Sequence, residues 1–170
     1  MESHKEDMIM GQNYTSKETS INSTKLPAVY NREKFEAGSR ILDYGCGKYT
    51  SHIREAVSGC FWYGYDKYNQ DEATNAATER EMKSGFDYAI CSNVLNVIDD
   101  DCSIRRIIKR LCECAKRVIF KIYEGDGSGI GRETKNDCWQ RNEKTSVYAE
   151  MIRSLGYNVT KVCSGYIYVN

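Results

Sequence analysis

The 170-residue chain lacks several features that would assign it at once to a class of protein. Neither charge is in excess, because 24 lysines and arginines balance 24 aspartates and glutamates. A neutral chain has no overall field that attracts nucleic acid, so nucleic acid is not indicated as a partner, although a local basic surface would permit it. Its apolar runs are too short to span a bilayer and its first residues are no signal peptide, so we expect a cytoplasmic protein with no membrane contact.

Histidine and proline are also scarce. The two histidines, His4 and His52, make a zinc site improbable, and we predict no bound metal. The eight cysteines form no Cys-x-x-Cys pair, and several lie in or beside apolar stretches, where cysteine packs as a small hydrophobic residue: Cys46, Cys60, Cys91 and Cys163. We therefore expect reduced thiols, as in a reducing compartment.

The length suits one domain. Residues 1–27 are polar, show no period and end at Pro27, the only proline, which predicts a flexible arm. Residues 28–170 are then a single domain.

The most informative stretch runs from Arg40 to Thr50. A short apolar run ends at Asp43, glycines follow at Gly45 and Gly47, and a helical pattern begins directly afterwards. This order predicts a strand, a tight glycine turn and a helix, which is the opening of a nucleotide-binding α/β unit. Glycine permits a positive φ at such a turn and lets a ligand approach the backbone.

A second apolar stretch, residues 60–65, ends at Asp66. This acid lies 21 residues after Gly45, close to the ~20-residue spacing at which a second-strand carboxylate accepts hydrogen bonds from a ribose. Asp66 could instead be a turn former, but we favour the ribose role because strand, turn, helix, strand and acid arrive in order.

Further elements follow in alternation. We expect a helix over 71–83 with Asp71 as its cap and Ala73, Ala76 and Ala77 inside, then a strand at 87–91. Helices should begin near 101, capped by Asp101 or Ser103, and near 145, capped by Thr145 or Ser146. Between them lies a strand at 117–123, and the chain ends in a hairpin around Ser164-Gly165.

Leu42-Asp-Tyr-Gly-Cys-Gly47 resembles the first motif of class I S-adenosylmethionine-dependent methyltransferases. Asp66 matches the ribose-binding acid of that family, and residues 86–98 resemble its fourth strand and the segment after it. The resemblance covers residues 40–170 and implies a Rossmann-like α/β sandwich, with a mostly parallel sheet and a C-terminal antiparallel hairpin. No third strand is visible between Asn69 and Phe86, so we expect one edge strand to be missing. The stretch from Thr19 to Pro27 is similar to that of compact phage- and prophage-type enzymes.

The same resemblance implies which residues bind S-adenosylmethionine: Asp43, Gly45, Cys46, Gly47, Asp66, Lys67, Ser92 and Asn93. Lys25 could pair with the carboxylate of this cofactor, although a solvated tail is the favoured interpretation.

The loop at 124–144 is long and rich in glycine, which is typical of a functional segment. We expect it to lack regular structure, to pack through Ile130 and Trp139, and to cover the methyl acceptor. Its candidate acceptor contacts are Arg132, Gln140, Arg141 and Asn142. Candidates for catalysis are Asn93, Asn96 and Asp126, although both asparagines could simply cap a turn. No general base is evident, and neither the Asn-Pro-Pro-aromatic nor the Pro-Cys signature of DNA methyltransferases occurs.

Two other functions stay open. The domain could bind S-adenosylmethionine or a partner without catalysis. It could also be a nicotinamide-dependent reductase, but Thr50 stands where the dinucleotide fingerprint needs Gly or Ala. The acceptor of a methyltransferase is open too: a small molecule, a nucleic acid base or a protein side chain.

Overall fold

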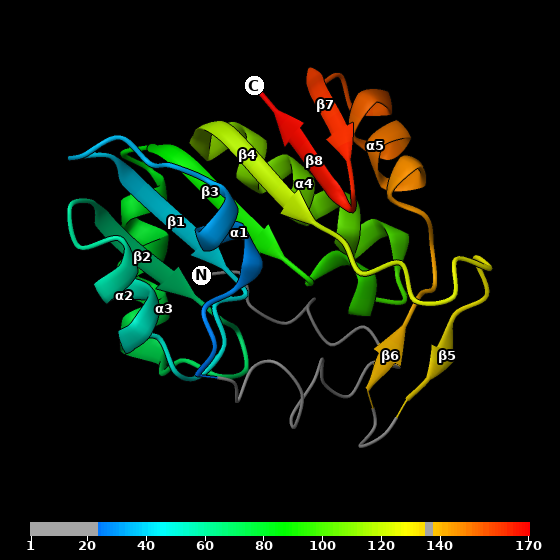
Figure 1. Ribbon diagram of the computed structural model, residues 1–170, viewed down its shortest axis with the longest axis horizontal. Coiled ribbons are helices and arrows are strands. Elements are labelled where there is room, and N and C mark those ends of the chain that lie inside the picture. The colour runs from blue at the N-terminus through cyan, green and yellow to red at the C-terminus, as the bar shows by residue number, and fades with distance from the viewer. Residues whose placement is uncertain (1–23, 135–137) are drawn as a thin grey trace, which may run out of the picture.

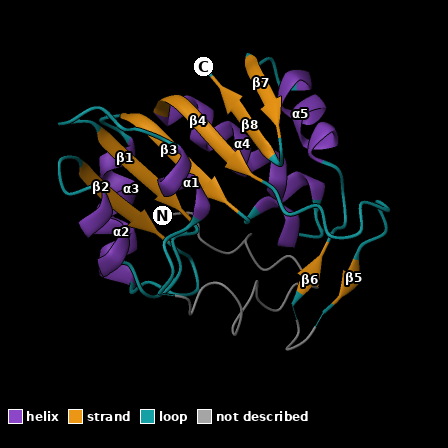
Figure 2. Ribbon diagram, viewed as in Figure 1, coloured by secondary structure: helices purple, strands orange, loops and turns teal. Residues whose placement is uncertain are grey.

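The structure is a computed structural model that describes residues 24–134 and 138–170. Its centre is a six-stranded sheet in the order β2-β1-β3-β4-β8-β7 (Figures 1 and 2). Four neighbouring strands are parallel: β1 (Arg40–Tyr44), β2 (Phe61–Tyr65), β3 (Phe86–Ser92) and β4 (Ala115–Lys121). β8 (Tyr166–Val169) pairs antiparallel with both β4 and β7 (Val159–Cys163), which confirms the predicted C-terminal hairpin.

Helices cover both faces of this sheet. Buried side chains of α1 (Ala28–Arg32) and α2 (Ser51–Ala56) belong to one cluster, and those of α3 (Glu72–Met82), α4 (Asp101–Cys114) and α5 (Thr145–Ser154) belong to the other. Adjacent strand residues serve opposite clusters: Ile41 packs with α1 and α2, and Leu42 packs on the other side, both with no exposed surface. A sheet buried on both faces needs such continuous apolar strands.

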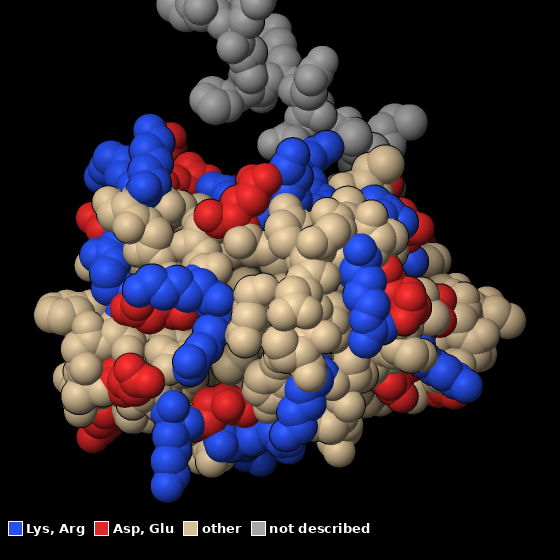
Figure 3. All heavy atoms as spheres, turned by 90° about the horizontal axis from the view of Figure 1, so that it is seen from above, with Lys and Arg blue, Asp and Glu red and all other residues tan. Residues whose placement is uncertain are grey.

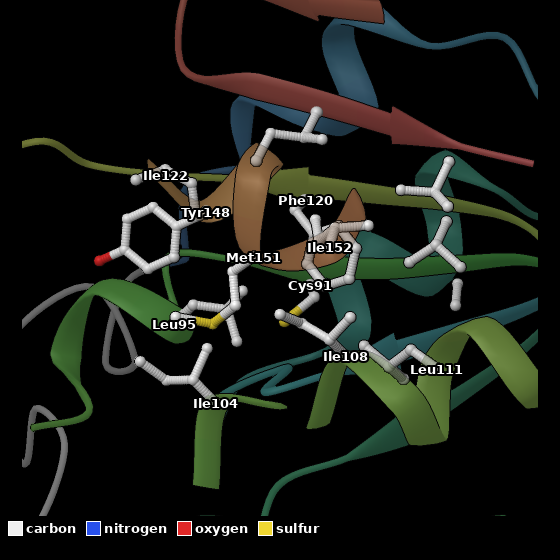
Figure 4. Close-up of a cluster of buried hydrophobic side chains, with 14 of the residues drawn as sticks. Cys91, Leu95, Ile104, Ile108, Leu111, Phe120, Ile122, Tyr148, Met151 and Ile152 are labelled. Carbon is white, nitrogen blue, oxygen red and sulfur yellow. The ribbon is translucent and has the colours of Figure 1, made fainter. Parts of the chain in front are cut away.

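The larger cluster contains the helical stripe that the sequence predicts on α4. Figure 4 shows Ile104, Ile108 and Leu111 of this helix directed toward α5 and toward Cys91 and Phe120 of the sheet. Cys91 is fully buried among apolar side chains, and all eight cysteines are free thiols. Cys91 therefore packs as a small hydrophobic residue, as the sequence indicates.

The order of the strands creates a switch point at β1. The chain moves outward from β1 to β2 through α2 on one face, and then crosses back to β3, on the other side of β1, through α3 on the opposite face. Both crossovers then have the same hand, as the rule for parallel connections requires. In open α/β sheets, ligands bind beyond the carboxyl ends of the strands at such a switch point.

β2 forms one edge of the sheet, which confirms the expected loss of an edge strand. Side chains of α3 bond to the backbone of this strand and of the residue after it. The Asn75 side-chain amide accepts from the Asp66 N–H at 3.0 Å and donates to the Asp66 carbonyl at 2.9 Å, and the Thr78 hydroxyl donates to the Gly64 carbonyl at 2.8 Å. Helix side chains thus satisfy edge groups that a neighbouring strand would otherwise bond.

Two predictions, on the inner side of α3 and on the cap of α4, need correction. The inner side of α3 carries Thr78 and Met82, whereas Ala73 and Ala77 are exposed, because the helix turns its polar bonding residues toward β2. Asp100, not Asp101 or Ser103, caps α4 by accepting from the Cys102 and Ser103 N–H groups.

The N-terminus of α5 is capped from outside the helix. Glu124 Oε1 accepts from the Thr145 N–H at 2.7 Å and from its hydroxyl at 2.5 Å. Thr145 is therefore a donor to a distant carboxylate, and neither Thr145 nor Ser146 is the side-chain cap that the sequence suggests. The bond ties the segment after β4 to α5. For α3 the sequence is right, because Asp71 accepts from the Thr74 N–H at 2.8 Å.

The loop after β4 contains a small antiparallel pair, β5 (Arg132–Glu133) and β6 (Trp139–Gln140), which corrects the expectation of no regular structure. Ile130 is 73% exposed, so the expectation that it packs inward is also wrong. Figure 1 places this pair away from the main sheet, beyond the carboxyl ends of its parallel strands. The predicted arm of residues 1–27 lies, up to residue 23, outside the described residues.

Candidate functional site

The glycine turn after β1 is bonded to the end of β2. The N–H groups of Gly45 and Cys46 donate to the Tyr65 carbonyl at 2.7 and 3.2 Å, and the Gly47 N–H donates to Asp66 Oδ2 at 2.9 Å. Gly45 and Gly47 have φ values of 85° and 77°, in the left-handed region that favours glycine. The turn is therefore held against the switch point by three successive backbone donors.

Gly45 is required by internal packing. A Cβ atom built on it would lie 2.3 Å from Val94 Cγ2, so a methyl group from the segment after β3 occupies the space that glycine leaves. From the sequence we expected a ligand to use the space beside the glycines of this turn. At Gly45 the protein's own Val94 fills the Cβ side, and the role of Gly45 in cofactor binding stays a prediction.

The Asp66 carboxylate is the most highly coordinated side chain of the site. Its Oδ1 accepts from the Tyr68 N–H, the Asn69 N–H and Asn69 Nδ2, each at 3.0 Å, whereas Gly47 is the one donor to its Oδ2 among the residues that the structure describes. Asp66 is 6% exposed. A carboxylate oxygen has two lone pairs, so Oδ2 can accept one more hydrogen bond, while Oδ1 is saturated.

Asp43, at the end of β1, belongs to a buried polar chain. The Tyr30 hydroxyl donates to Asp43 Oδ2 at 2.6 Å, and Trp62 Nε1 donates to the Tyr30 oxygen at 3.0 Å. Burial raises the pKa of Asp43 to about 7; the Tyr30 hydrogen bond opposes this rise and the neighbouring Asp66 charge adds to it. This chain docks α1 on the strand that precedes the glycine turn.

Two asparagines after β3 have different surroundings. Asn93 is exposed, has a φ of 57°, and donates its N–H to the Lys121 carbonyl at 2.8 Å. Asn96 is 1% exposed; its Nδ2 donates to Gln140 Oε1 at 3.2 Å and its Oδ1 accepts from the Tyr123 N–H at 3.4 Å. Asn93 therefore stays a candidate for contact with an acceptor, whereas Asn96 holds the loop after β4.

Three of the predicted acceptor contacts also serve this loop. Gln140 Nε2 donates to the Tyr123 carbonyl, and Asn142, buried with a φ of 56°, donates to the Ile130 carbonyl at 2.9 Å. Arg141 donates to the Ile98 and Asp99 carbonyls and to Asp101 Oδ1. Most of their polar side-chain atoms bond within the protein, so they shape the loop, while the buried Arg141 Nε has no hydrogen-bond partner among the described residues.

Asp126 and Arg132 face solvent on the same loop, 3.8 Å apart as an ion pair. Lys67 and Lys25 are exposed, Ser92 and Cys46 are half-buried, and burial strongly raises the pKa of the Cys46 thiol. The roles proposed for these residues stay predictions.

Two residues of the site were not predicted from the sequence. Tyr30 meets Asp43 across 13 positions, and Gln70 Nε2 donates to the Gly47 carbonyl at 2.7 Å. Neither has a pattern that could have revealed it.

Charges of both signs are interspersed on one face of the molecule. On the face in Figure 3, lysines and arginines alternate with aspartates and glutamates. The basic residues of α4 have local partners, since Arg105 donates to Ser154, Lys109 pairs with Glu113, and Arg110 pairs with Glu79. Within the described ranges no group of metal-ligating side chains occurs, and no helix is long and apolar enough to cross a membrane.

The fold of this chain is similar to that of several solved methyltransferases. A 1,6-didemethyltoxoflavin-N1-methyltransferase from Burkholderia thailandensis superposes with a TM-score of 0.57 at 15% identity, over 78% of this chain and 69% of that one. A methyltransferase from Mesorhizobium loti gives 0.57 at 12% identity, over 84% and 94%. The chain has a class I methyltransferase fold.

The magnesium protoporphyrin IX methyltransferase of Synechocystis shares this methyltransferase fold, with a TM-score of 0.50 at 15% identity over 78% of this chain and 70% of that one. No protein-family model matches the chain, and neither does any curated protein. The fold predicted from the glycine turn and Asp66 is thus confirmed by structure, although sequence identity to these proteins is very low.

Proposed function

We propose that the chain is an S-adenosylmethionine-dependent methyltransferase that acts on a small molecule or a nucleic acid base. One observation carries the proposal: a buried carboxylate, Asp66, lies 2.9 Å from the glycine turn at the switch point of a methyltransferase fold. The chemistry of the site fits the cofactor, because Asp66 Oδ2 has one acceptor position left for a ribose hydroxyl.

The geometry limits how the cofactor is held. Val94 fills the space on the Cβ side of Gly45, so no ligand atom takes that place at the turn. Oδ1 of Asp66 is saturated, so this residue accepts from one hydroxyl rather than from two. Bound S-adenosylmethionine supplies an electrophilic methyl group. The chain has to align an acceptor behind that methyl group, and Ser92, Asn93 and the described part of the loop at 124–144 lie at the carboxyl-terminal edge of the sheet for this purpose.

Calorimetric titration with S-adenosylhomocysteine tests the proposal. Asp66→Asn should weaken binding about 10- to 100-fold, the loss that corresponds to one hydrogen bond to a charged acceptor. Asp71→Asn is the matched control, because it lies in the same loop and asparagine caps a helix as well as aspartate does. Equal affinity of the wild type and the folded Asp66→Asn variant would contradict the ribose assignment.

A non-catalytic S-adenosylmethionine-binding domain is the second candidate. It is favoured by the internal bonds of Gln140, Arg141 and Asn142, three of the four proposed acceptor contacts. Transfer of a tritiated methyl group to acceptors of several classes separates it from an enzyme. A thermal-shift comparison of NADH with S-adenosylhomocysteine tests the reductase alternative: stabilisation by NADH supports a reductase, and stabilisation by S-adenosylhomocysteine alone rules it out.

A further inference from the structure

Two cations lie against one tyrosine ring at the end of β4. The Arg32 guanidinium carbon is 4.6 Å and Lys121 Nζ is 4.8 Å from the centre of the Tyr166 ring. Arg32 ends α1, Lys121 ends β4, and Tyr166 begins β8 as the partner of Lys121 in the sheet. Three segments that are distant in sequence thus bring two positive charges together.

The charge of Lys121 has no acidic partner within ion-pair distance in the part of the chain that the structure describes. Its Nζ donates to the Ile122 and Ser164 carbonyls at 3.2 and 3.3 Å, which leaves the third ammonium hydrogen available. Glu124, whose charge acts on Lys121, is bound to the N-terminus of α5. Burial and the charge of Arg32 both lower the pKa of Lys121, and Glu124 opposes this.

Arg32 is only partly neutralised. Its Nε donates to the Tyr168 hydroxyl at 3.0 Å and lies 3.6 Å from Glu33 Oε1, which also accepts from that hydroxyl at 2.6 Å. Its Nη2 donates weakly to Cys163 Sγ at 3.3 Å. The Nη1 end meets no acceptor among the described residues, and the side chain is 38% exposed. Arg32 and Lys121 carry two positive charges, and among the described residues Glu33 is the one carboxylate within ion-pair distance of them, so one charge is left without an ion-pair partner and donors stay unused.

The position of this pair of cations connects it to the candidate site. Lys121 is the sheet partner of Ser92, one strand spacing of ~4.8 Å away, and its carbonyl accepts from Asn93. The turn at Ser164-Gly165 lies at the same edge, because β8 runs antiparallel to β4. A ligand that reaches Asn93 therefore reaches Lys121 with a neighbouring group.

We propose that Arg32 and Lys121 bind an anionic group, a phosphate or a carboxylate, of the methyl acceptor. That the anion belongs to a methyl acceptor rests on the proposed function, whereas the anion site itself rests on the geometry of Arg32 and Lys121. An anion between the two cations receives the free hydrogen of Lys121 and the Nη1 hydrogens of Arg32, and it removes the repulsion between them. The acceptor is accordingly a charged compound, or a nucleotide read through its phosphate.

NMR titration of the full chain with inorganic pyrophosphate tests the anion site directly. The amides of Ser164 and Gly165 should shift in a saturable way, and Lys121→Met and Arg32→Gln should each weaken binding about 10-fold. The matched control is Lys161→Met, because Lys161 also lies over a tyrosine of this hairpin, 5.6 Å from the Tyr168 ring centre. Unchanged affinity in a folded Lys121→Met protein overturns the anion site.

A second experiment tests the acceptor role and its source. Methyl transfer is compared within two pairs, a nucleoside with its 5′-monophosphate and a phenol with a hydroxybenzoate. The anionic member of one pair should be preferred at least 10-fold in kcat/KM, and Lys121→Met should abolish this preference while Lys161→Met keeps it. The pair that responds identifies phosphate or carboxylate. A preference for the neutral members overturns the acceptor role. Pyrophosphate binding at Lys121 without transfer to any acceptor refutes the proposed function and leaves the anion site.

Discussion

Replacement of Asp43 by asparagine should change how the stability of the protein depends on pH. Asp43 is 3% exposed, and burial is the main cause that raises its pKa to about 7. Asparagine has nearly the same shape and keeps an oxygen that accepts from the Tyr30 hydroxyl, so the polar chain with Trp62 stays intact. The variant therefore removes the charge and little else.

The sign follows from proton linkage. The folded state binds the proton of Asp43 more tightly than the unfolded state, where the pKa is about 3.9. The group therefore favours folding most at low pH, and this contribution is lost as pH rises through about 7. A difference of about 3 pKa units at ~1.36 kcal/mol each corresponds to about 4 kcal/mol between pH 4 and pH 8.

Equilibrium urea unfolding at a series of pH values measures this effect. The free energy of unfolding of Asp43→Asn minus that of the wild type should rise by about 4 kcal/mol from pH 4 to pH 8, since the contributions of the other carboxylates cancel. Asp87→Asn is the control with the opposite sign, because bonds from the Arg40 N–H and Lys116 lower the pKa of Asp87. A flat difference curve for Asp43→Asn would refute the assignment of a buried, easily protonated carboxylate.

Further predictions concern the turn and the loop. Gly45→Ala should destabilise the protein by about 1–3 kcal/mol, because the new Cβ meets Val94 and a φ of 85° is strained for alanine. Gly59→Ala is the control and should be nearly neutral, because a Cβ at Gly59 enters open space. Thermal melting of both variants measures the difference. Glu124→Ala should lower the free energy of unfolding by about 1 kcal/mol, because α5 loses its cap. Glu150→Ala, at an exposed position of the same helix, is the control. Equal melting temperatures of these two variants would contradict the capping role of Glu124. The Asp66→Asn and Lys121→Met variants described above test the cofactor and anion sites by affinity rather than stability.

Local patterns were sufficient where the physical cause is local. The glycine turn, the cap Asp71 and the hairpin at Ser164-Gly165 each depend on a few adjacent residues, and all three are confirmed. An error arose where the partner is distant, because Glu124 takes the capping role at α5 from across 21 positions. That Val94 fills the Cβ side of Gly45 likewise depends on a distant segment.

The candidate site divides in the same way. Asp66 and the glycines could be found because their spacing reflects one strand-turn-helix-strand unit. The burial of Asn96 and the internal bonds of Arg141 could not, because they depend on how the loop after β4 returns to the segment after β3. A polar residue in a long loop has the same appearance in sequence whether it holds the loop or contacts a ligand.

The amino-acid sequence by itself determined the alternation of strands and helices, the missing edge strand and the turn at which the sheet switches direction, because hydrophobic period, glycine and spacing act over short distances. Only the tertiary structure decided which polar groups have spare bonding capacity. Among the described residues, Asp66 Oδ2, Arg32 and Lys121 have it, whereas the side-chain amides of Asn96 and Gln140 are bonded to each other and to the Tyr123 backbone. The burial and the bonds of each group depend on segments that meet only when the chain is folded.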